Sequence, residues 1–180
     1  MSSDRKFGES GQWRRYAGGA VAVVVIVVAL VVARTGNSAE KVPTGRAPAA
    51  EAFQTLDGSS ASFEKYRGRP PVVNFFASWC APCLAEMPGF ERVSQDLGDR
   101  VAFLGINLQD SSEAGRRVVE QTGITYDVAR DPSGALFKSF GAIAMPTTVL
   151  IDANGKVVDL ISGELSARSL RDRIDKALLS

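Results

Sequence analysis

The sequence contains no histidine, and only two of its 180 residues are cysteines. Without histidine the usual general base at neutral pH is missing, which excludes hydrolases built on Ser–His or Cys–His pairs. The net charge is only +1, so electrostatic binding of nucleic acid is not indicated. The chain has no glycine-rich phosphate loop and no internal repeat. Any catalysis must therefore use cysteine, carboxylates or lysine.

The two cysteines stand two residues apart at the end of the run Val72–Cys83. Val72–Phe76 is β-branched and aromatic, which predicts a buried strand, and the residues after Cys83 are good helix formers. Cys80 is therefore expected near the start of a helix, where free N–H groups and the helix dipole favour a thiolate. The thiolate is the nucleophile in disulfide exchange, so the pattern favours a redox-active pair.

Three other roles compete with redox chemistry. A zinc site usually needs four Cys, His or acidic ligands, and this chain offers two cysteines and no histidine. A Cu(I) metallochaperone that binds through both thiolates is the alternative function, although neither His nor Met stands beside the motif. A structural disulfide across two residues closes almost no loop and removes little entropy from the unfolded chain. We therefore predict a redox-active Cys80–Cys83 disulfide, with no metal and no cofactor.

The N-terminal part carries an uncharged apolar run, Tyr16–Ala33. As a helix it rises about 27 Å, close to the thickness of a hydrocarbon core. Four basic residues precede it: Arg5, Lys6, Arg14 and Arg15. Only Arg34 follows closely, so the positive-inside rule predicts a cytoplasmic N-terminus. The alternative is a cleaved signal peptide, but the small-residue stretch Val31–Ala33 lies inside the apolar run.

These patterns divide the chain into four parts. We predict a cytoplasmic segment at 1–15, an uncleaved transmembrane anchor at 16–33, a flexible tether at 34–50 and a folded domain at 51–180. The tether is rich in Gly, Pro, Ala and polar residues and has no apolar periodicity. The expected location is a bacterial cell membrane, crossed once, with the folded domain on the extracytoplasmic side.

Within the domain, apolar patterns and turn residues predict an alternation of strands and helices. The expected strands are 53–56, 72–76, 101–108, 126–128, 147–151 and 156–161, and the expected helices are 63–66, 81–97, 112–121, 135–140 and a final one after Ser166. Asn154–Gly155 predicts a hairpin whose two strands lie at the edge of the sheet. The order of elements predicts an α/β sandwich around a mixed sheet.

With these elements the chain resembles the thioredoxin-like superfamily, and more closely its TlpA/ResA-like branch of membrane-anchored thiol–disulfide oxidoreductases. The resemblance spans about residues 50–179 and rests on Phe75–Cys83, on Glu86 and Pro88, and on Ala144–Thr148. It implies a three-layer α/β/α sandwich with a central mixed β-sheet, preceded by one N-terminal transmembrane helix.

The resemblance also implies roles for single residues. Cys80 matches the nucleophilic cysteine and Cys83 the resolving cysteine, which attacks the mixed disulfide. Pro146 matches the cis-proline that faces the cysteines, and Trp79 matches an apolar platform beside them. A cis-proline donates no N–H, which leaves the backbone of Met145 free to pair with a substrate strand. Trp79, Met145 and Pro146 are thus the expected substrate-binding residues.

One position departs from thioredoxin itself, which has an acidic residue six positions before its first cysteine. Here that residue is Asn74, as is common in the ResA-like branch, and an amide cannot take up a proton. Glu86 follows Cys83 by one helical turn and is the candidate acid–base partner, as in the branch. The alternative is that Glu86 is a solvated surface residue.

The resemblance favours reduction of disulfides over oxidation of exported proteins. In the branch, reduction supports cytochrome c maturation, where the two cysteines of apocytochrome c must be kept as thiols. The expected partners are protein thiol or disulfide substrates, among them apocytochrome c, and a membrane protein that brings electrons from the cytoplasm. The uncharged dipeptide Ala81–Pro82 between the cysteines does not reveal the redox potential.

Overall fold

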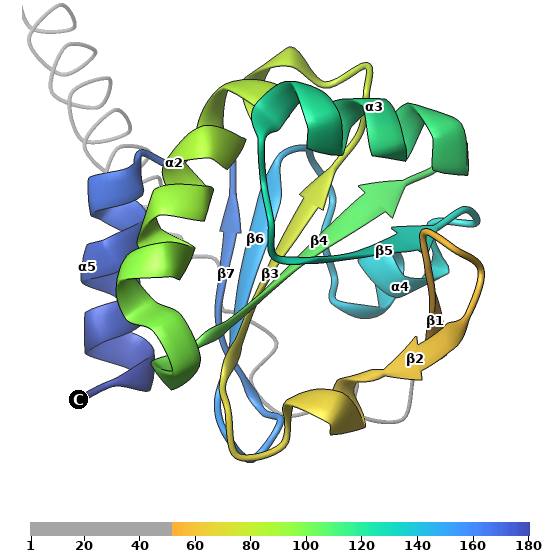
Figure 1. Cartoon of the computed structure of the whole chain (residues 1–180). Helices are drawn as coiled ribbons and strands as arrows, with labels where there is room; N and C mark the ends of the chain where they lie inside the picture. Colours follow the sequence, from red (N-terminus) through yellow and green to blue (C-terminus); the bar gives the residue numbers. More distant parts are fainter. Residues whose placement is uncertain (1–51) are drawn as a thin grey trace, which may run out of the picture. The chain divides into compact units, whose positions relative to one another are not determined.

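The computed structural model describes residues 52–180, which form one seven-stranded sheet with helices on both faces (Figure 1). The strands are β1 (Ala52–Thr55), β2 (Ser60–Ser62), β3 (Pro71–Phe76), β4 (Ala102–Leu108), β5 (Asp127–Asp131), β6 (Thr147–Ile151) and β7 (Val157–Ser162). The helices are α2 (Ala81–Leu97), α3 (Ser112–Thr122), α4 (Ala135–Ser139) and α5 (Ala167–Leu178), with 3₁₀ turns η1 (Phe63–Tyr66) and η2 (Gly98–Arg100). The predicted three-layer α/β/α sandwich around a mixed sheet is confirmed.

The strand that leads to the cysteines, β3, lies inside the sheet between β4, which is parallel to it, and β6, which is antiparallel. All six of its residues are buried, because helices cover both faces of the sheet. Successive side chains of a strand point to opposite faces. Val73 and Phe75 join one core cluster, whereas Val72 and Phe76 join the clusters beneath α2. By the same alternation Asn74 points toward α2.

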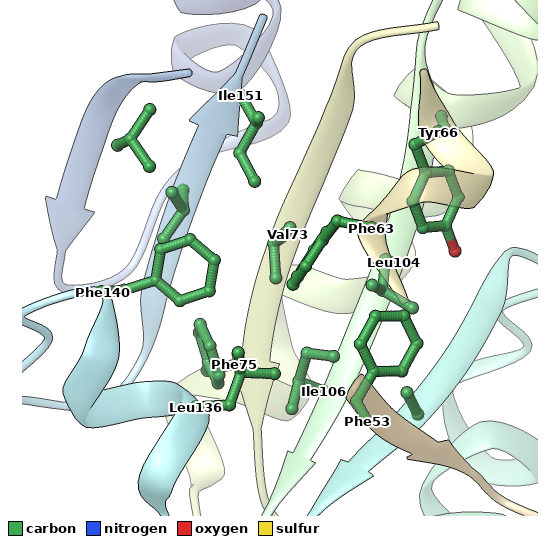
Figure 2. Packing of buried hydrophobic residues seen from close by; sticks show 14 residues of the cluster. Phe53, Phe63, Tyr66, Val73, Phe75, Leu104, Ile106, Leu136, Phe140 and Ile151 are labelled. Carbon is green, nitrogen blue, oxygen red and sulfur yellow. The ribbon is translucent and has the colours of Figure 1, made fainter. Parts of the chain in front are cut away.

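The core on the η1 and α4 face is rich in aromatic rings (Figure 2). The ring of Phe63 packs edge-on against Phe53 and Phe140, with centroids 5.1 and 5.8 Å apart. Phe75 of β3 packs edge-on against Phe137 and Phe140, at 5.2 and 5.8 Å. Edge-to-face pairs of this kind stabilise by about 1 kcal/mol beyond the burial of their area. They hold α4 and the residues around it against β3, the strand that leads to the cysteines.

The opposite face is covered by α2, α3 and α5. Gly89 lets α2 approach the start of α5 closely, because an added Cβ would stand only 3.3 Å from the Cβ of Ala167. Leu170 and Ile174 of α5 are fully buried against Phe90 of α2 and its neighbours. This close packing brings the segment before α5 to the middle of α2.

Two features of the sheet differ from the prediction. The strand β2 was not predicted, because Ser60–Ser62 is short, polar and without apolar alternation; it pairs with β1 across a turn in which Asp57 Oδ1 accepts the Ser59 N–H. The hairpin of β6 and β7 was predicted to supply edge strands, which is wrong for β6. That strand lies between β3 and β7 and is buried throughout. Its apolar run Val149–Ile151 is what a strand covered on both faces needs.

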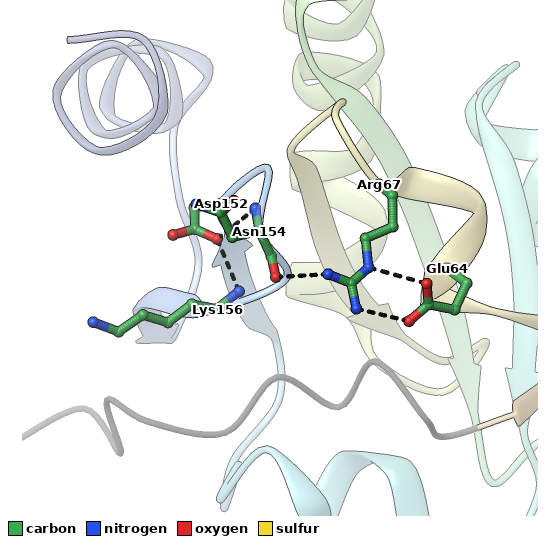
Figure 3. Close-up of polar contacts among 5 residues, drawn as sticks. All are labelled: Glu64, Arg67, Asp152, Asn154 and Lys156. Atoms are coloured by element: carbon green, nitrogen blue, oxygen red, sulfur yellow. Dashed lines mark hydrogen bonds and ion pairs between the residues drawn. The ribbon is translucent and has the colours of Figure 1, made fainter.

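The hairpin predicted from Asn154–Gly155 is present and is tied to η1 (Figure 3). Asp152 Oδ1 accepts the backbone N–H groups of Asn154 and Lys156, both at 2.9 Å. Arg67 pairs with both oxygens of Glu64 and donates from Nη1 to the carbonyl oxygen of Asn154 at 3.3 Å. These bonds fix the end of β6 that lies farthest from the cysteines.

The segments predicted as cytoplasmic (1–15), membrane-spanning (16–33) and tether (34–50) lie outside the described residues. Between residues 52 and 180, none of the helices has the length and the apolar character needed to cross a bilayer.

Candidate active site

The two cysteines lie where the sequence predicts, at the junction of β3 and α2. Cys80 is the residue that caps the start of α2, and its N–H donates to the carbonyl oxygen of Ala77 at 3.1 Å. Its own carbonyl accepts the N–H of Leu84 at 3.2 Å, which begins the helix. Pro82 stands in the first turn, where its missing N–H costs no hydrogen bond. Cys80 therefore stands at the N-terminus of α2, where the free N–H groups and the positive end of the helix dipole lie.

Cys80 and Cys83 are joined by a disulfide, with their Cα atoms 5.3 Å apart. Cys80 keeps 5% of its surface exposed, whereas Cys83 is fully buried one turn deeper in α2. Both sulfurs lie in a cluster with Phe76, Ala77 and Met87. A thiolate from another protein therefore meets Cys80 first, and Cys83 can be reached only from within the molecule.

The residues predicted to bind substrate lie around this disulfide. The Met145–Pro146 peptide bond is cis, as predicted. Met145 is partly buried and packs against the cluster that contains both cysteines. Its backbone N–H and C=O make no hydrogen bond to any other residue between 52 and 180. Trp79 is 61% exposed beside Cys80 and forms one wall of a groove.

The groove has a volume of about 690 Å³. Its lining is mostly apolar and comes from the turn before Cys80, from the end of β4, from α4 and from the loop before β6. The residues are Trp79, Leu108, Gln109, Gly134, Phe137, Lys138, Ala142, Ile143, Ala144 and Met145. Trp79 and Ile143 are the two large apolar side chains that remain exposed in the described part of the chain. Ile143 was missed from the sequence, because a single apolar residue in a loop carries no periodic signal.

Glu86 is buried, which contradicts the alternative that it is a solvated surface residue. It is only 4% exposed and lies one turn after Cys83, on the buried face of α2 that also carries Cys83. Its Oε1 accepts from Asn74 Nδ2 at 2.8 Å, and its Oε2 accepts from the backbone N–H of Leu165 at 2.9 Å. Asn74 thus does not replace an acid in this site; it is the hydrogen-bond partner of one.

Burial raises the pKa of Glu86 to about 7. The hydrogen bonds from Leu165 and Asn74 favour the charged form, but they offset only part of the desolvation, and the nearby charge of Glu164 raises the pKa further. A carboxyl group with this pKa exists in both protonation states at neutral pH. It is therefore suited to accept and return a proton under physiological conditions.

Two other buried carboxylates hold the backbone. Glu91 accepts from both the N–H and the hydroxyl of Thr125, at 2.8 and 2.6 Å. Burial opposes the ionisation of Glu91, but the hydrogen bonds outweigh it and lower its pKa. Asp131 accepts the N–H of Phe137 at 2.8 Å at the start of α4. Both groups bind backbone elsewhere in the domain, whereas Glu86 follows Cys83 by one turn on the buried face of α2, so Glu86 is the acid–base candidate for that thiol.

The loop before Cys80 is held by Asp110, a residue that sequence reasoning missed. Oδ2 of Asp110 accepts from the backbone N–H of Ser78 at 2.8 Å and from Asn107 Nδ2 at 3.2 Å, while Oδ1 accepts the N–H of Ser111. Burial opposes ionisation here too, but these bonds lower the pKa of Asp110. Gln109, the residue before Asp110, has a φ of 48°. This left-handed backbone conformation costs a residue other than glycine roughly 1 kcal/mol. A lone Asp after a strand gives no sequence signal of such a contact.

Within residues 52–180, no group of three or more His, Cys, Asp or Glu side chains comes together as metal ligands would. The site thus presents two sulfurs, one buried carboxyl group and an apolar groove. That set is sufficient for thiol–disulfide exchange, which needs a nucleophilic thiolate, a second thiol and a group that takes up its proton.

Comparison with known proteins agrees with this chemistry. The family described as Redoxin matches residues 37–178. The chain belongs to the Redoxin family. It is 28% identical over 138 residues to the thiol-disulfide oxidoreductase ResA of Bacillus thuringiensis subsp. konkukian, covering 76% of this chain and 80% of that protein.

Two solved structures of this kind extend the likeness to three dimensions. A thiol:disulfide interchange protein of the thioredoxin family from Chlorobium tepidum TLS is 30% identical, with a TM-score of 0.63 over 74% of this chain and 97% of that one. A DsbF homologue from Corynebacterium diphtheriae is 27% identical, with a TM-score of 0.67 over 76% of this chain and 88% of that one. This Redoxin-family chain is therefore a thioredoxin-like, ResA-like thiol–disulfide oxidoreductase, and Cys80–Cys83 is the disulfide that it presents.

Proposed function

We propose that this oxidoreductase reduces disulfides in protein substrates on the extracytoplasmic side of a bacterial membrane. The observation that carries the choice of substrate is the apolar groove beside the disulfide, with Trp79 and Ile143 exposed on its rim. Exposed aromatic and aliphatic side chains of this kind are typical of protein-binding surfaces. The free backbone of Met145 offers a hydrogen-bonding edge to an extended segment that crosses the groove.

The exchange proceeds in two steps. The Cys80 thiolate attacks one sulfur of the substrate disulfide, which forms a mixed disulfide and releases the other substrate sulfur as a thiolate. Cys83 then gives its proton to Glu86 and attacks the sulfur of Cys80. The second substrate thiolate leaves, and the Cys80–Cys83 disulfide forms. Two electrons pass from the protein to the substrate, whose two thiolates become protonated.

Each turnover leaves the protein oxidised, so the proposal requires a donor of two electrons. We propose a membrane partner that carries electrons from the cytoplasm and reduces Cys80–Cys83 by the same exchange chemistry. The substrate class that we favour is an apocytochrome c whose paired cysteines must be reduced before haem attachment. Resemblance to the ResA-like branch supports both assignments.

The redox potential of the Cys80–Cys83 pair tests the direction of exchange. We expect a value below about −230 mV, at which the dithiol is a good reductant of exposed disulfides. The measurement equilibrates the full-length protein with glutathione or thioredoxin couples of known potential and quantifies the free thiols. A potential near −120 mV, typical of a strong oxidant, would instead assign the protein to disulfide formation.

The location depends on the apolar run Tyr16–Ala33 and on the basic residues before it. We expect the full-length chain in the membrane fraction, with its domain exposed to protease added outside the cytoplasm. A matched control replaces two valines of the run by arginine, Val24→Arg and Val28→Arg, which should prevent retention in the membrane. A full-length wild-type chain found only in the soluble fraction would overturn the anchor.

A further inference from the structure

The buried amide of Asn74 makes only part of the hydrogen bonds that it is able to make. Nδ2 donates to Glu86 Oε1 at 2.8 Å and lies 3.4 Å from the hydroxyl oxygen of Thr148. Oδ1 is buried and has no hydrogen-bond partner in the described part of the chain. A buried acceptor without a partner is destabilising and is rare in folded proteins.

The protonation of Glu86 provides an explanation for this unpartnered oxygen. In the present arrangement both carboxylate oxygens face donors, the amide of Asn74 and the N–H of Leu165, which suits only the charged form. When Glu86 takes up a proton, its new O–H needs an acceptor. The N–H of Leu165 cannot accept, and neither can Nδ2 of Asn74. Asn74, which already bonds Oε1, offers an acceptor after a simple rotation of its amide, because its Oδ1 has no partner in the described part of the chain.

We propose that Asn74 is a positioning residue whose amide turns by half a rotation as Glu86 changes its protonation state. With charged Glu86, Nδ2 donates to the carboxylate; with neutral Glu86, Oδ1 accepts the carboxylic O–H. The hydroxyl of Thr148 accepts from Nδ2 in the first state and donates to Oδ1 in the second. Each state leaves one amide atom without a partner, so neither orientation is locked.

This inference deepens the proposed function, in which Glu86 takes the proton of Cys83. The rotation supplies a partner for the new O–H, so that the proton taken up by Glu86 is not itself left unpaired in the buried site. An aspartate at position 74 could not do this while charged, because it has no proton to donate. The proposal thereby gives a physical reason for an amide rather than an acid in this place.

The other groups that face Glu86 do not supply the same function. Glu164, in the loop before α5, raises the pKa of Glu86 by its charge but is exposed. Tyr126, before β5, has a buried hydroxyl group whose pKa is raised by burial and by the charges of Glu91 and Glu86, so it stays protonated. Asn74 from β3 and Thr148 from β6 carry no charge, and Cys83 does not titrate while it is in the disulfide.

The test is an NMR titration of the oxidised, full-length, isotope-labelled protein from pH 5 to pH 9, without substrate. We expect the nuclear Overhauser contacts between the Asn74 side-chain NH₂ and Thr148 to be strong at pH 9 and at least threefold weaker at pH 5. The midpoint of this change should coincide with the titration of the Glu86 carboxyl carbon. Because no turnover occurs, the result is independent of the direction of exchange, the substrate and the location.

Two variants sharpen the test. In Glu86→Gln, the side-chain oxygen of the glutamine accepts the N–H of Leu165. The NH₂ group of the glutamine then faces Asn74 and should hold the Oδ1 atom of Asn74 toward position 86. The contact between the Asn74 NH₂ and Thr148 should then be weak at every pH. Glu120→Gln makes the same chemical change on an exposed part of α3 and should behave like the wild type.

Two results would overturn the proposal. If Glu86 titrates while the contacts of the Asn74 NH₂ with Thr148 stay constant, the amide does not turn. If Glu86 keeps one protonation state from pH 5 to pH 9, there is no change for the amide to follow. A disulfide-exchange assay on the same samples decides separately whether the proposed reduction of substrates holds.

Discussion

Replacing Cys83 by serine is expected to trap the protein on its substrate, whereas replacing Cys80 by serine is expected to abolish exchange. Cys80 caps the start of α2 and is the sulfur that an outside molecule meets first. Cys83 is fully buried, so its role is to attack the sulfur of Cys80 from within. With Cys83→Ser the first step proceeds and the second cannot. A stable mixed disulfide should then be visible on a non-reducing gel and disappear on addition of dithiothreitol.

Alkylation of the two single-cysteine variants provides a quantitative check. Cys80 stands at the N-terminus of a helix and keeps part of its surface exposed, whereas Cys83 is fully buried among apolar side chains. At pH 6 we expect iodoacetamide to modify Cys80 in Cys83→Ser about tenfold faster than Cys83 in Cys80→Ser. The opposite order of rates would exchange the roles of the two cysteines.

Much of this fold was predictable because its central elements are local in sequence. The run Val72–Phe76 is apolar on both faces, which indicates a strand covered on both sides, and the structure has a strand at Pro71–Phe76. The helix predicted at 81–97 has those bounds in the structure. Strand β2 escaped prediction, since three small polar residues become a strand only when β1 lies beside them.

The site was less predictable, because several of its hydrogen bonds come from backbone groups and join residues that lie far apart in the sequence. The N–H that binds Glu86 belongs to Leu165, 79 residues away, and any residue except proline supplies such a group. Asp110 reaches Ser78 from the end of a neighbouring strand, 32 residues along the chain. Residue identity at either position carries no trace of these bonds. The hydrogen bond from Asn74 to Glu86 was not predicted either. Asn74 stands where thioredoxin has an acidic residue, and nothing in the sequence shows that its amide donates to a carboxylate on the next helix.

Replacing Glu86 by glutamine is expected to slow the second step of exchange by about a hundredfold at pH 7, at the lower end of general acid–base effects. The first attack by Cys80 should remain close to that of the wild type, because Glu86 follows the buried Cys83 on α2 and Cys80 is the sulfur that keeps some exposure. Single-turnover kinetics that follow formation and decay of the mixed disulfide separately, from pH 5 to pH 9, measure both steps. In the wild type the rate of the second step should rise through pH 7, as the carboxylate forms. Equal rates and equal pH profiles in both proteins would remove Glu86 from the reaction.

The same substitution should change how stability depends on pH. The pKa of Glu86 is about 7 in the folded protein and about 4.5 in an unfolded chain, so between these values the folded state binds more protons. The free energy of unfolding of the wild type therefore falls as the pH rises from 4.5 to 7, by up to about 3 kcal/mol from this group. Glu86→Gln removes this contribution, so its stability relative to the wild type should increase between pH 5 and pH 8. Urea unfolding of the oxidised proteins at both pH values measures the difference, with Glu120→Gln as the matched control. If the two curves keep a constant separation, the carboxyl group does not carry its raised pKa in the folded protein. The Glu86 carboxyl group would then be fully charged at neutral pH and would be a poor proton acceptor for Cys83.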